Sequence, residues 1–368
     1  MHFAFTEEQI ELRNAVRDLL AKECPPEVVR RAWSGGAGRT DRAWNAMAEM
    51  GVLGVVAPEA IGGIGGDEVD LVGVLEETGR AALPEPIVET AAVAVPLLAE
   101  AGDDRAAALS EGGACASAIA PTDDLAVWAD TADLLVLFDD TGVHAVATSD
   151  AELERRHSVD GARRLHRVVA RLGDSTRVGG PDAAALAFDR GALGVAAQLL
   201  GLGAQLLDTT VDYAKQREQF GAPIGSFQAV KHHLANVRLA LEFAAPLVYR
   251  AAWSIASRDG ERSVHVSMAK AHASDAAVLA SRSALQCHGA IGYTTEHDLH
   301  LWMKRAWALG AAWGSAPGTA AASRARSCDD RRPGAEIMSE AAPYCTERTR
   351  RGRAWPERPG PKGQERES

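Results

Sequence analysis

Apolar side chains recur every three or four residues through the 29 positions from Phe227 to Ile255. Because an α-helix turns once every 3.6 residues, this spacing places them on one stripe of a single helix of about eight turns. The stripe consists of Phe227, Val230, Leu234, Val237, Leu241, Ala245, Val248, Ala252 and Ile255. A helix of this length buries such a stripe against other helices, and Pro246 inside it is expected to bend it.

Three more segments with helical spacing supply the neighbours of this helix. One starts at Asp189, a candidate N-cap, another runs from Ser263 to Cys287, and the last covers about Asp298 to Leu309. The buried face of the segment that begins at Ser263 is expected to consist of Met268, Ala271, Val278 and Leu285. We therefore predict a C-terminal four-helix bundle over residues 181–322.

The part of the chain before the bundle predicts two further modules. In residues 1–115, "FTEEQ" predicts a helix that starts with a capping box of Thr6 and Gln9, and further helical segments lie at 44–50, 70–79 and 87–99. In residues 116–180, two β-type runs within 134–147 are joined by an Asp-Asp-Thr-Gly turn, which predicts a hairpin, and 165–172 is a candidate strand. The predicted fold is mainly α-helical with a small central β domain.

Composition limits the classes of function that this chain can serve. A formal net charge of −11 argues against nucleic-acid or anionic-membrane binding, and no segment reaches the roughly 20 apolar residues that cross a bilayer. The five cysteines lack CxxC pairs and the N-terminus lacks a signal-peptide pattern, so we expect a cytoplasmic protein. His297 and His300 favour a polar helix start over a metal site, because no third ligand at metal spacing accompanies them. Residues 323–368, rich in Arg, Glu, Pro and Gly, predict a disordered tail.

Two motifs carry a family resemblance. "YAKQREQFGAPIGSFQAVKHHLANV" (213–237) and "LQCHGAIGYTTEHDLHLWMKRA" (285–306) together resemble the acyl-CoA dehydrogenase family, and "FTEEQ" and "MGVLGVVAPEAIGGIGG" (50–66) fit it in the same order. The resemblance implies an N-terminal helical domain, a middle β domain and a C-terminal four-helix bundle. It also implies FAD, which accepts a hydride from Cβ of an acyl-CoA while a carboxylate removes the Cα proton.

The resemblance implies cofactor-binding residues in both motifs. In the family, an Arg-x-x-Phe-Gly motif and a Gln-x-x-Gly-Gly motif reach across a dimer interface to the adenine and pyrophosphate half of the neighbour's FAD. The corresponding residues here are Arg217, Phe220 and Gln228 from the first motif and Gln286 and Gly289 from the second, where Ala290 replaces the last glycine. Arginine offers fixed donors for a pyrophosphate, phenylalanine a surface for an adenine, and glycine a close backbone approach.

The catalytic carboxylate of the family has no counterpart at its usual place. Aligned on "LWMKRA", that position is Trp313, and an indole accepts no proton. Some branches of the family carry a base directly before an arginine at the start of the first C-terminal helix, which here is Asp189 before Arg190. Asp189 is one methylene shorter than glutamate, and an N-cap role explains it equally well.

The middle segment "ASAIAPTDDLAVWADTADLLVLF" also lacks the family's Thr-Glu-Pro-type loop and Trp-Ile-Thr-type strand, although Trp128 stands in the region. These losses, beside motifs that serve a neighbour, resemble the α2β2 acyl-CoA dehydrogenases of actinobacterial steroid side-chain catabolism. The resemblance implies a second acyl-CoA dehydrogenase subunit as partner, an acyl-CoA substrate and electron-transferring flavoprotein as acceptor. The alternatives are a self-sufficient enzyme that uses Asp189, a flavin-dependent hydroxylase or oxidase, and a non-catalytic stabilising partner.

Overall fold

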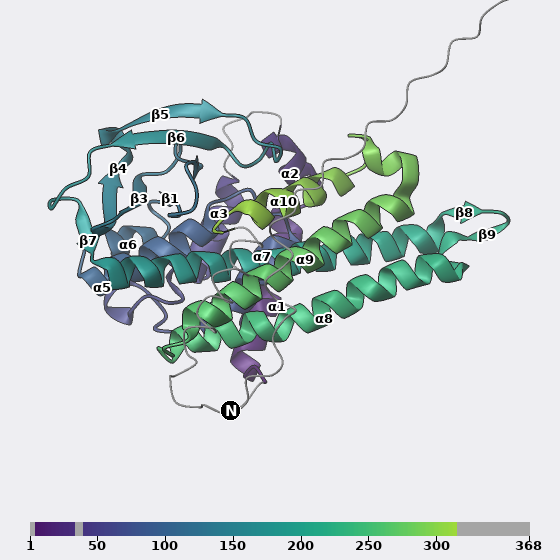
Figure 1. The fold of residues 1–368 in the computed structure, drawn as a ribbon, viewed down its shortest axis with the longest axis horizontal. Helices are drawn as coiled ribbons and strands as arrows, with labels where there is room; N and C mark the ends of the chain where they lie inside the picture. Colours follow the sequence, from purple (N-terminus) through teal and green to yellow (C-terminus); the bar gives the residue numbers. More distant parts are fainter. Residues whose placement is uncertain (1–3, 34–39, 315–368) are drawn as a thin grey trace, which may run out of the picture. The chain divides into compact units, whose positions relative to one another are not determined.

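The computed structural model describes residues 4–33 and 40–314. The chain divides into two units, 1–326 and 327–368, and every described residue belongs to the first. The tail predicted at 323–368 lies outside the described residues. Figure 1 shows a mainly helical unit that carries a small group of strands, which confirms the predicted fold class.

The N-terminal helices are short and are joined by tight turns. The predicted capping box is present, since Thr6 and Gln9 exchange hydrogen bonds at the start of the first helix. The elements are α1 Glu7–Glu23, α2 Pro26–Trp33, α3 Asp41–Glu49, η1 Val52–Gly54, η2 Glu59–Ile61, α4 Glu68–Arg80, η3 Val88–Ala94, α5 Val95–Ala101 and α6 Arg105–Ser110.

The segment predicted as one α-helix over 87–99 is wound in two ways. Val88–Ala94 is a π-helix, and an α-helix continues from Val95. Pro96 accounts for part of this change, because proline has no N–H and its ring excludes the carbonyl four residues earlier. The Val95 N–H accordingly bonds the Thr90 carbonyl, five residues back.

The strands β1 to β7 form two small sheets. One has the order β1-β3-β4-β7, with β1 parallel to β3, and the other has the order β2-β6-β5. The predicted hairpin is confirmed as β3 and β4, which pair from Leu134 with Ala147 to Asp139 with Gly142. The elements are β1 Ala116–Ala118, β2 Ala126–Val127, β3 Leu134–Asp139, β4 Gly142–Ala147, η4 Thr148–Asp150, β5 Ala151–Arg156, β6 Leu165–Ala170 and β7 Arg177–Gly179.

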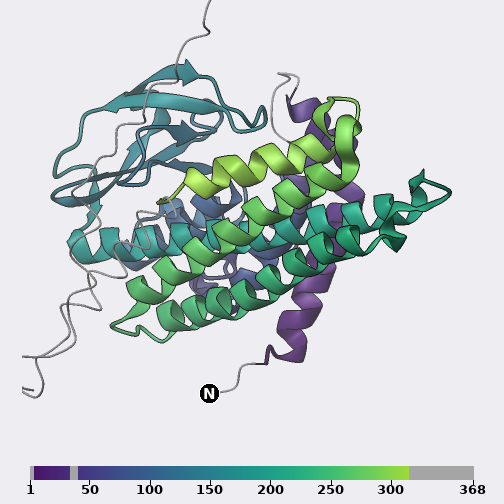
Figure 2. The same cartoon turned by 45° about the vertical axis from the view of Figure 1, so that its right-hand side comes forward.

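Four helices follow the strands and run side by side, as both ribbon views show (Figures 1 and 2). The elements are α7 Pro181–Gln216, β8 Glu218–Gln219, β9 Ala222–Pro223, η5 Ile224–Ser226, α8 Gln228–Ala256, α9 Arg262–His288, η6 Gly289–Tyr293 and α10 Leu299–Ala311. The hairpin β8–β9 lies at the far end of α7 and α8 (Figure 1). Among the described residues, α7 alone is long and apolar enough to cross a bilayer, but 72% of its apolar window is buried inside the protein.

The predicted stripe on α8 is mostly buried from Val237 onward. Val237, Val248, Ala252 and Ile255 are almost inaccessible to solvent, whereas Phe227 at the other end is 37% exposed. Pro246 lies inside α8, which continues unbroken around it, and the bend stays a prediction.

The predicted buried face of α9 is wrong. Met268 is 37% exposed, and the buried face consists mainly of alanine and serine, including Ala269, Ala273, Ala277 and Ser281. Small side chains let neighbouring backbones approach closely, so α9 packs between α7 and α8 without a stripe of large residues.

Candidate functional site

Trp313 occupies a turn directly after α10. Its backbone adopts a positive φ of 53°, and its side chain is only 2% exposed. The backbone N–H donates to Oδ2 of Asp123 at 3.1 Å, and the indole Nε1 points to Oε1 of Glu89 at 3.4 Å. Two carboxylates from distant parts of the chain therefore hold the residue at the position where the family resemblance implies a base.

The indole of Trp313 packs against other rings and bare backbone. The rings of Phe138 and Phe188 lie 6.5 Å and 6.1 Å from it, between centroids. A Cβ atom placed on Gly191 of α7 would lie 2.3 Å from an indole carbon. The indole therefore takes up the space that any larger residue at position 191 would need.

Of the two carboxylates that contact Trp313, Glu89 is buried and Asp123 is half-buried. Burial raises the pKa of Glu89 above its ordinary value, although Arg163 and the indole N–H oppose that rise. Burial also raises the pKa of Asp123, against the backbone N–H of Trp313 and the charge of Arg163. Each acid keeps a cation within electrostatic reach, as buried carboxylates require.

Lys270 holds the same turn from the side of α9. Its ammonium is fully buried and donates to the backbone carbonyls of Gly310 at 3.1 Å and Gly314 at 2.9 Å. Burial lowers its pKa to about 8, and Asp123 partly offsets that effect. These buried charges were not predicted from the sequence, where the one available signal was a charged residue inside an apolar run, as at "IVETAAVAV" and "SMAKAHA".

Asp189 lies inside α7 and not at its start. The helix begins at Pro181 with Gly180 as its N-cap, so the N-cap interpretation of Asp189 is wrong. The carboxylate is 3% exposed, accepts a hydrogen bond from Ser263 Oγ at 2.7 Å and pairs with Arg262 Nε at 3.2 Å. Asp189 and Gly191 are two residues apart, so they face nearly opposite sides of the helix. Because Gly191 faces Trp313, Asp189 faces away from it.

The first predicted cofactor motif forms the end of α7 and the hairpin after it. Arg217 caps α7 through a backbone N–H bond to the Tyr213 carbonyl at 2.8 Å, and its side chain is exposed. Phe220 and Gly221 form the hairpin turn with φ values of 53° and 78°, and Phe220 is 95% exposed. A non-glycine residue at positive φ and a fully solvated phenyl ring both cost free energy in the isolated chain.

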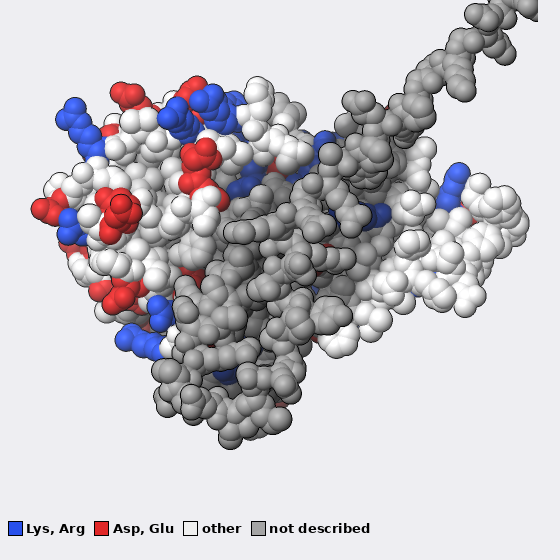
Figure 3. Space-filling model, in the orientation of Figure 1, with Lys and Arg blue, Asp and Glu red and all other residues white. Residues whose placement is uncertain are grey.

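The other predicted cofactor residues lie at the same end of the bundle. Gln228 is the exposed first residue of α8, and Gln286 is exposed in the last turn of α9. Gly289 ends α9 with φ 63° and ψ −137°, a backbone conformation open to glycine, and the space beside its Cα is empty of other described atoms. The part of this end that is visible in Figure 3 shows few charged side chains.

The two cofactor motifs lie at the C-terminal end of α7, whereas Trp313 packs near its N-terminal end. Gly191 contacts Trp313, whereas Tyr213 stacks on His288 in the last turn of α9 with ring centroids 4.2 Å apart. These two positions are 22 residues apart on one helix, which corresponds to about 33 Å at 1.5 Å per residue. The structure therefore brings the two cofactor motifs together and keeps them far from Trp313.

Trp128 is enclosed by its own chain. It follows β2 with a positive φ of 56°, is 2% exposed, and lies with the guanidinium of Arg164 at 6.0 Å from its ring centroid. Its backbone N–H donates to the Arg164 carbonyl at 2.7 Å. The Trp128 indole therefore packs inside the protein.

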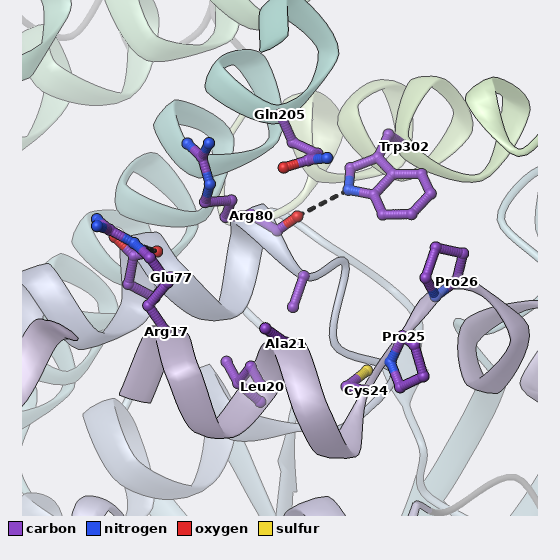
Figure 4. Close-up of a pocket in the computed structure, with 11 residues that line it drawn as sticks. Arg17, Leu20, Ala21, Cys24, Pro25, Pro26, Glu77, Arg80, Gln205 and Trp302 are labelled. Carbon is purple, nitrogen blue, oxygen red and sulfur yellow. Dashed lines mark hydrogen bonds and ion pairs between the residues drawn. The ribbon is translucent and has the colours of Figure 1, made fainter. Parts of the chain in front are cut away.

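A cavity of 270 Å³ opens between α1, α4, α7 and α10. Figure 4 shows Arg17, Arg80, Gln205 and Trp302 around it, with the Trp302 indole N–H donating to the Arg80 carbonyl at 2.8 Å. None of the predicted site residues lines this cavity. Within residues 4–33 and 40–314, no group of three or more His, Cys, Asp and Glu side chains is arranged to hold a metal ion.

Comparison with known proteins identifies relatives over both ends of the described region. The model of the acyl-CoA dehydrogenase N-terminal domain matches residues 6–108, and that of the acyl-CoA dehydrogenase C-terminal domain matches residues 179–316. Acyl-CoA dehydrogenase IpdE2 of Mycolicibacterium smegmatis is 34% identical over 302 residues, which cover 82% of this chain and 93% of the relative.

Solved structures share the fold at lower identity. The ChsE4-ChsE5 complex of Mycobacterium tuberculosis superposes with a TM-score of 0.81 at 23% identity, covering 90% of this chain and 99% of the other. The Tcur3481-Tcur3483 steroid ACAD gives a TM-score of 0.79 at 23% identity, over 88% of this chain and 99% of the other.

Proposed function

Because this chain belongs to the acyl-CoA dehydrogenase family, we propose that it is one subunit of a heteromeric acyl-CoA dehydrogenase and completes the FAD site of a second subunit, which carries the base. The observation that carries this proposal is the placement of the two cofactor motifs. Arg217, Phe220 and Gln286 are exposed at one end of the bundle, about 33 Å along α7 from Trp313. Side chains placed in this way are available to another chain.

The environment of Trp313 supports the proposal that the base is carried by the second subunit. A buried indole held by Asp123 and Glu89 fills the place of the family's carboxylate, and Lys270 fixes the turn around it. A base must reach the proton that it removes, and it must ionise near neutral pH. We therefore propose that α,β-dehydrogenation of the acyl-CoA uses a carboxylate of the partner.

The motif residues fit the adenine and pyrophosphate half of FAD. The guanidinium of Arg217 has no hydrogen bond or ion pair within the described chain, so its donors are free for a pyrophosphate. Phe220 offers an uncovered ring face to an adenine, Gly289 leaves room for a close approach, and Gln228 and Gln286 offer amide groups. FAD, when bound there, supplies the hydride acceptor of the reaction.

The substrate and the assembly are proposed by analogy with the relatives. ChsE4-ChsE5 is a complex of two proteins, and Tcur3481-Tcur3483 is named a steroid ACAD. We propose a steroid side-chain acyl-CoA thioester as substrate, electron-transferring flavoprotein as electron acceptor and the cytoplasm as location. Fold-level analogy is the basis for the substrate, the family resemblance for the acceptor, and the cysteine pattern for the location.

Flavin content tests the proposal directly. The chain is purified alone and also co-produced with the acyl-CoA dehydrogenase encoded beside it, and flavin absorbance is measured per chain. We expect a colourless isolated chain and a yellow complex with about one FAD per two chains. An isolated chain that holds one FAD and is bleached by an acyl-CoA would overturn the proposal and make Asp189 the leading base. A yellow complex that keeps its full flavin content with Arg217→Ala would instead assign the chain a stabilising role.

A further inference from the structure

Three aromatic side chains meet where α7 and α9 end. The ring of Tyr213 on α7 stacks on the imidazole of His288 on α9, with centroids 4.2 Å apart and planes 21° from parallel. His297, from the segment before α10, approaches both rings edge-on, 4.8 Å from His288 and 6.2 Å from Tyr213. The cluster thus joins three elements at the end of the bundle that carries the cofactor motifs.

His288 is held in one tautomer. Its Nδ1 lies 2.8 Å from the backbone carbonyl of Ala284, and because a carbonyl only accepts, Nδ1 carries the proton. Nε2 then presents a lone pair, and it is buried without a hydrogen-bond partner among the described residues. The side chain is 4% exposed, and burial lowers its pKa, as does the nearby His297. Burial therefore favours the neutral form of the imidazole.

His288 is also the last residue of α9, two residues after Gln286 and directly before Gly289. On the other side of the stack, Tyr213 is four residues before Arg217 and accepts its backbone N–H at 2.8 Å. The stack of Tyr213 on His288 therefore connects the helix turn that carries the first motif with the helix turn that carries the second.

We propose that His288 is a positioning residue that fixes the two cofactor motifs relative to each other by stacking on Tyr213. The inference rests on the proposed function, in which both motifs bind the adenine and pyrophosphate half of a neighbour's FAD. Two motifs that must contact one ligand bind it more tightly when their relative position is set in advance. Loss of the stack then weakens FAD binding although no residue in contact with FAD has changed.

FAD affinity of the complex tests the role of the stack. The complex of this chain with its base-bearing partner is stripped of flavin, and the dissociation constant for added FAD is measured by flavin fluorescence. His288→Asn keeps a donor near the Ala284 carbonyl but removes the ring, and Tyr213→Leu removes the other ring. We expect each variant to weaken FAD binding about three- to tenfold, the range of an aromatic pair.

Two matched variants serve as controls. Tyr213→Phe preserves the stack, and His272→Asn replaces an exposed histidine of the same helix, so both should bind FAD within about twofold of the unaltered complex. FAD binding that is unchanged in both His288→Asn and Tyr213→Leu would overturn the inference. If Arg217→Ala is equally without effect, the proposed function fails as well; if Arg217→Ala weakens binding, the inference alone fails. If the His288→Asn chain does not assemble with its partner, the FAD affinity of the Tyr213→Leu complex tests the inference.

A pH profile separates positioning from general stability. A histidine that is buried neutral favours the ordered state, and that preference is lost as the pH falls below its ordinary pKa of about 6.5. Tyr213 and His297 are the titratable groups in ring contact with His288, and no carboxylate is among these ring contacts within the described residues. FAD affinity should therefore decrease as the pH is lowered from 7.5 to 5.5. This decrease should be smaller in His288→Phe, and it should persist in His297→Gln. A decrease of the same size in His288→Phe would contradict the assignment.

Discussion

At the scale of single residues, Gly191 and Trp313 form a matched pair. Gly191→Ala places a methyl group 2.3 Å from the indole, so the ring or the helix must move. We expect a loss of about 1–3 kcal/mol in the free energy of unfolding, as for other overpacked core positions. The measurement is urea unfolding of the isolated chain.

Two further variants show whether the clash is the cause. In a Trp313→Ala background the same change at Gly191 should be harmless or stabilising, since alanine favours helices by up to about 1 kcal/mol. Gly310→Ala is the matched control, because a Cβ there meets no other described atom. An equal loss at Gly191 with and without the indole would contradict the pairing.

Phe220 combines two local costs, a positive φ and 95% exposure. Asparagine tolerates positive φ and is favoured before glycine in two-residue hairpin turns. Phe220→Asn should therefore stabilise the isolated chain by up to about 1 kcal/mol, seen as a higher melting temperature, while the complex with its partner retains less FAD. Unchanged FAD retention would remove Phe220 from the proposed cofactor site.

At the scale of elements, Lys270 links α9 to the turn after α10. Because burial lowers its pKa from 10.5 to about 8, the unfolded chain binds this proton more tightly than the folded chain between those values. Stability from this group therefore rises as the pH increases from about 8 to 10.5, by up to about 3 kcal/mol. Lys270→Met should show a smaller rise over that interval when both proteins are unfolded in urea, and equal pH profiles would exclude the effect.

Sequence patterns predicted the elements whose buried faces consist of large apolar residues. The stripe on α8 and the hairpin of β3 and β4 are examples, because their large apolar side chains recur with the period of a helix or a strand. The buried face of α9 was not predictable in the same way, because alanine and serine occur on buried and exposed faces alike. The start of α7 did have a signal, Gly180 followed by Pro181, which favours a first helical turn there over one at Asp189.

At the scale of the whole described unit, the surroundings of Trp313 depend on contacts between parts far apart in the chain. Glu89 is 224 residues from Trp313, and Asp123 is 190 residues from it. Local patterns carry no information about such pairs, so the sequence predicted an indole at the expected base position but not what holds it. The cofactor motifs were predictable because each is a continuous stretch of sequence.

Arg305 ties all three parts of this unit together. From α10 it pairs with Asp160, which is fully buried in the loop before β6, and it donates to the Leu83 carbonyl after α4 at 2.8 Å. Arg305→Met removes the cation that pairs with the buried Asp160 carboxylate and leaves the charge of Arg163 near it, so we expect a cost of up to about 3–5 kcal/mol. We expect that loss in urea unfolding, together with faster amide hydrogen exchange in residues 157–170, where the strands meet the helices.

A second substitution separates the charge from the packing. Asp160→Asn in the Arg305→Met background removes the unpaired charge and should recover part of the stability, because burying a neutral amide costs less than burying a carboxylate. Arg156→Ala, which breaks an exposed pair with Glu154, should change the free energy of unfolding by less than about 1 kcal/mol. If Arg305→Met costs no more than Arg156→Ala, the ion pair does not hold the strands on the helices, and apolar packing between the sheets and α7 carries that role instead.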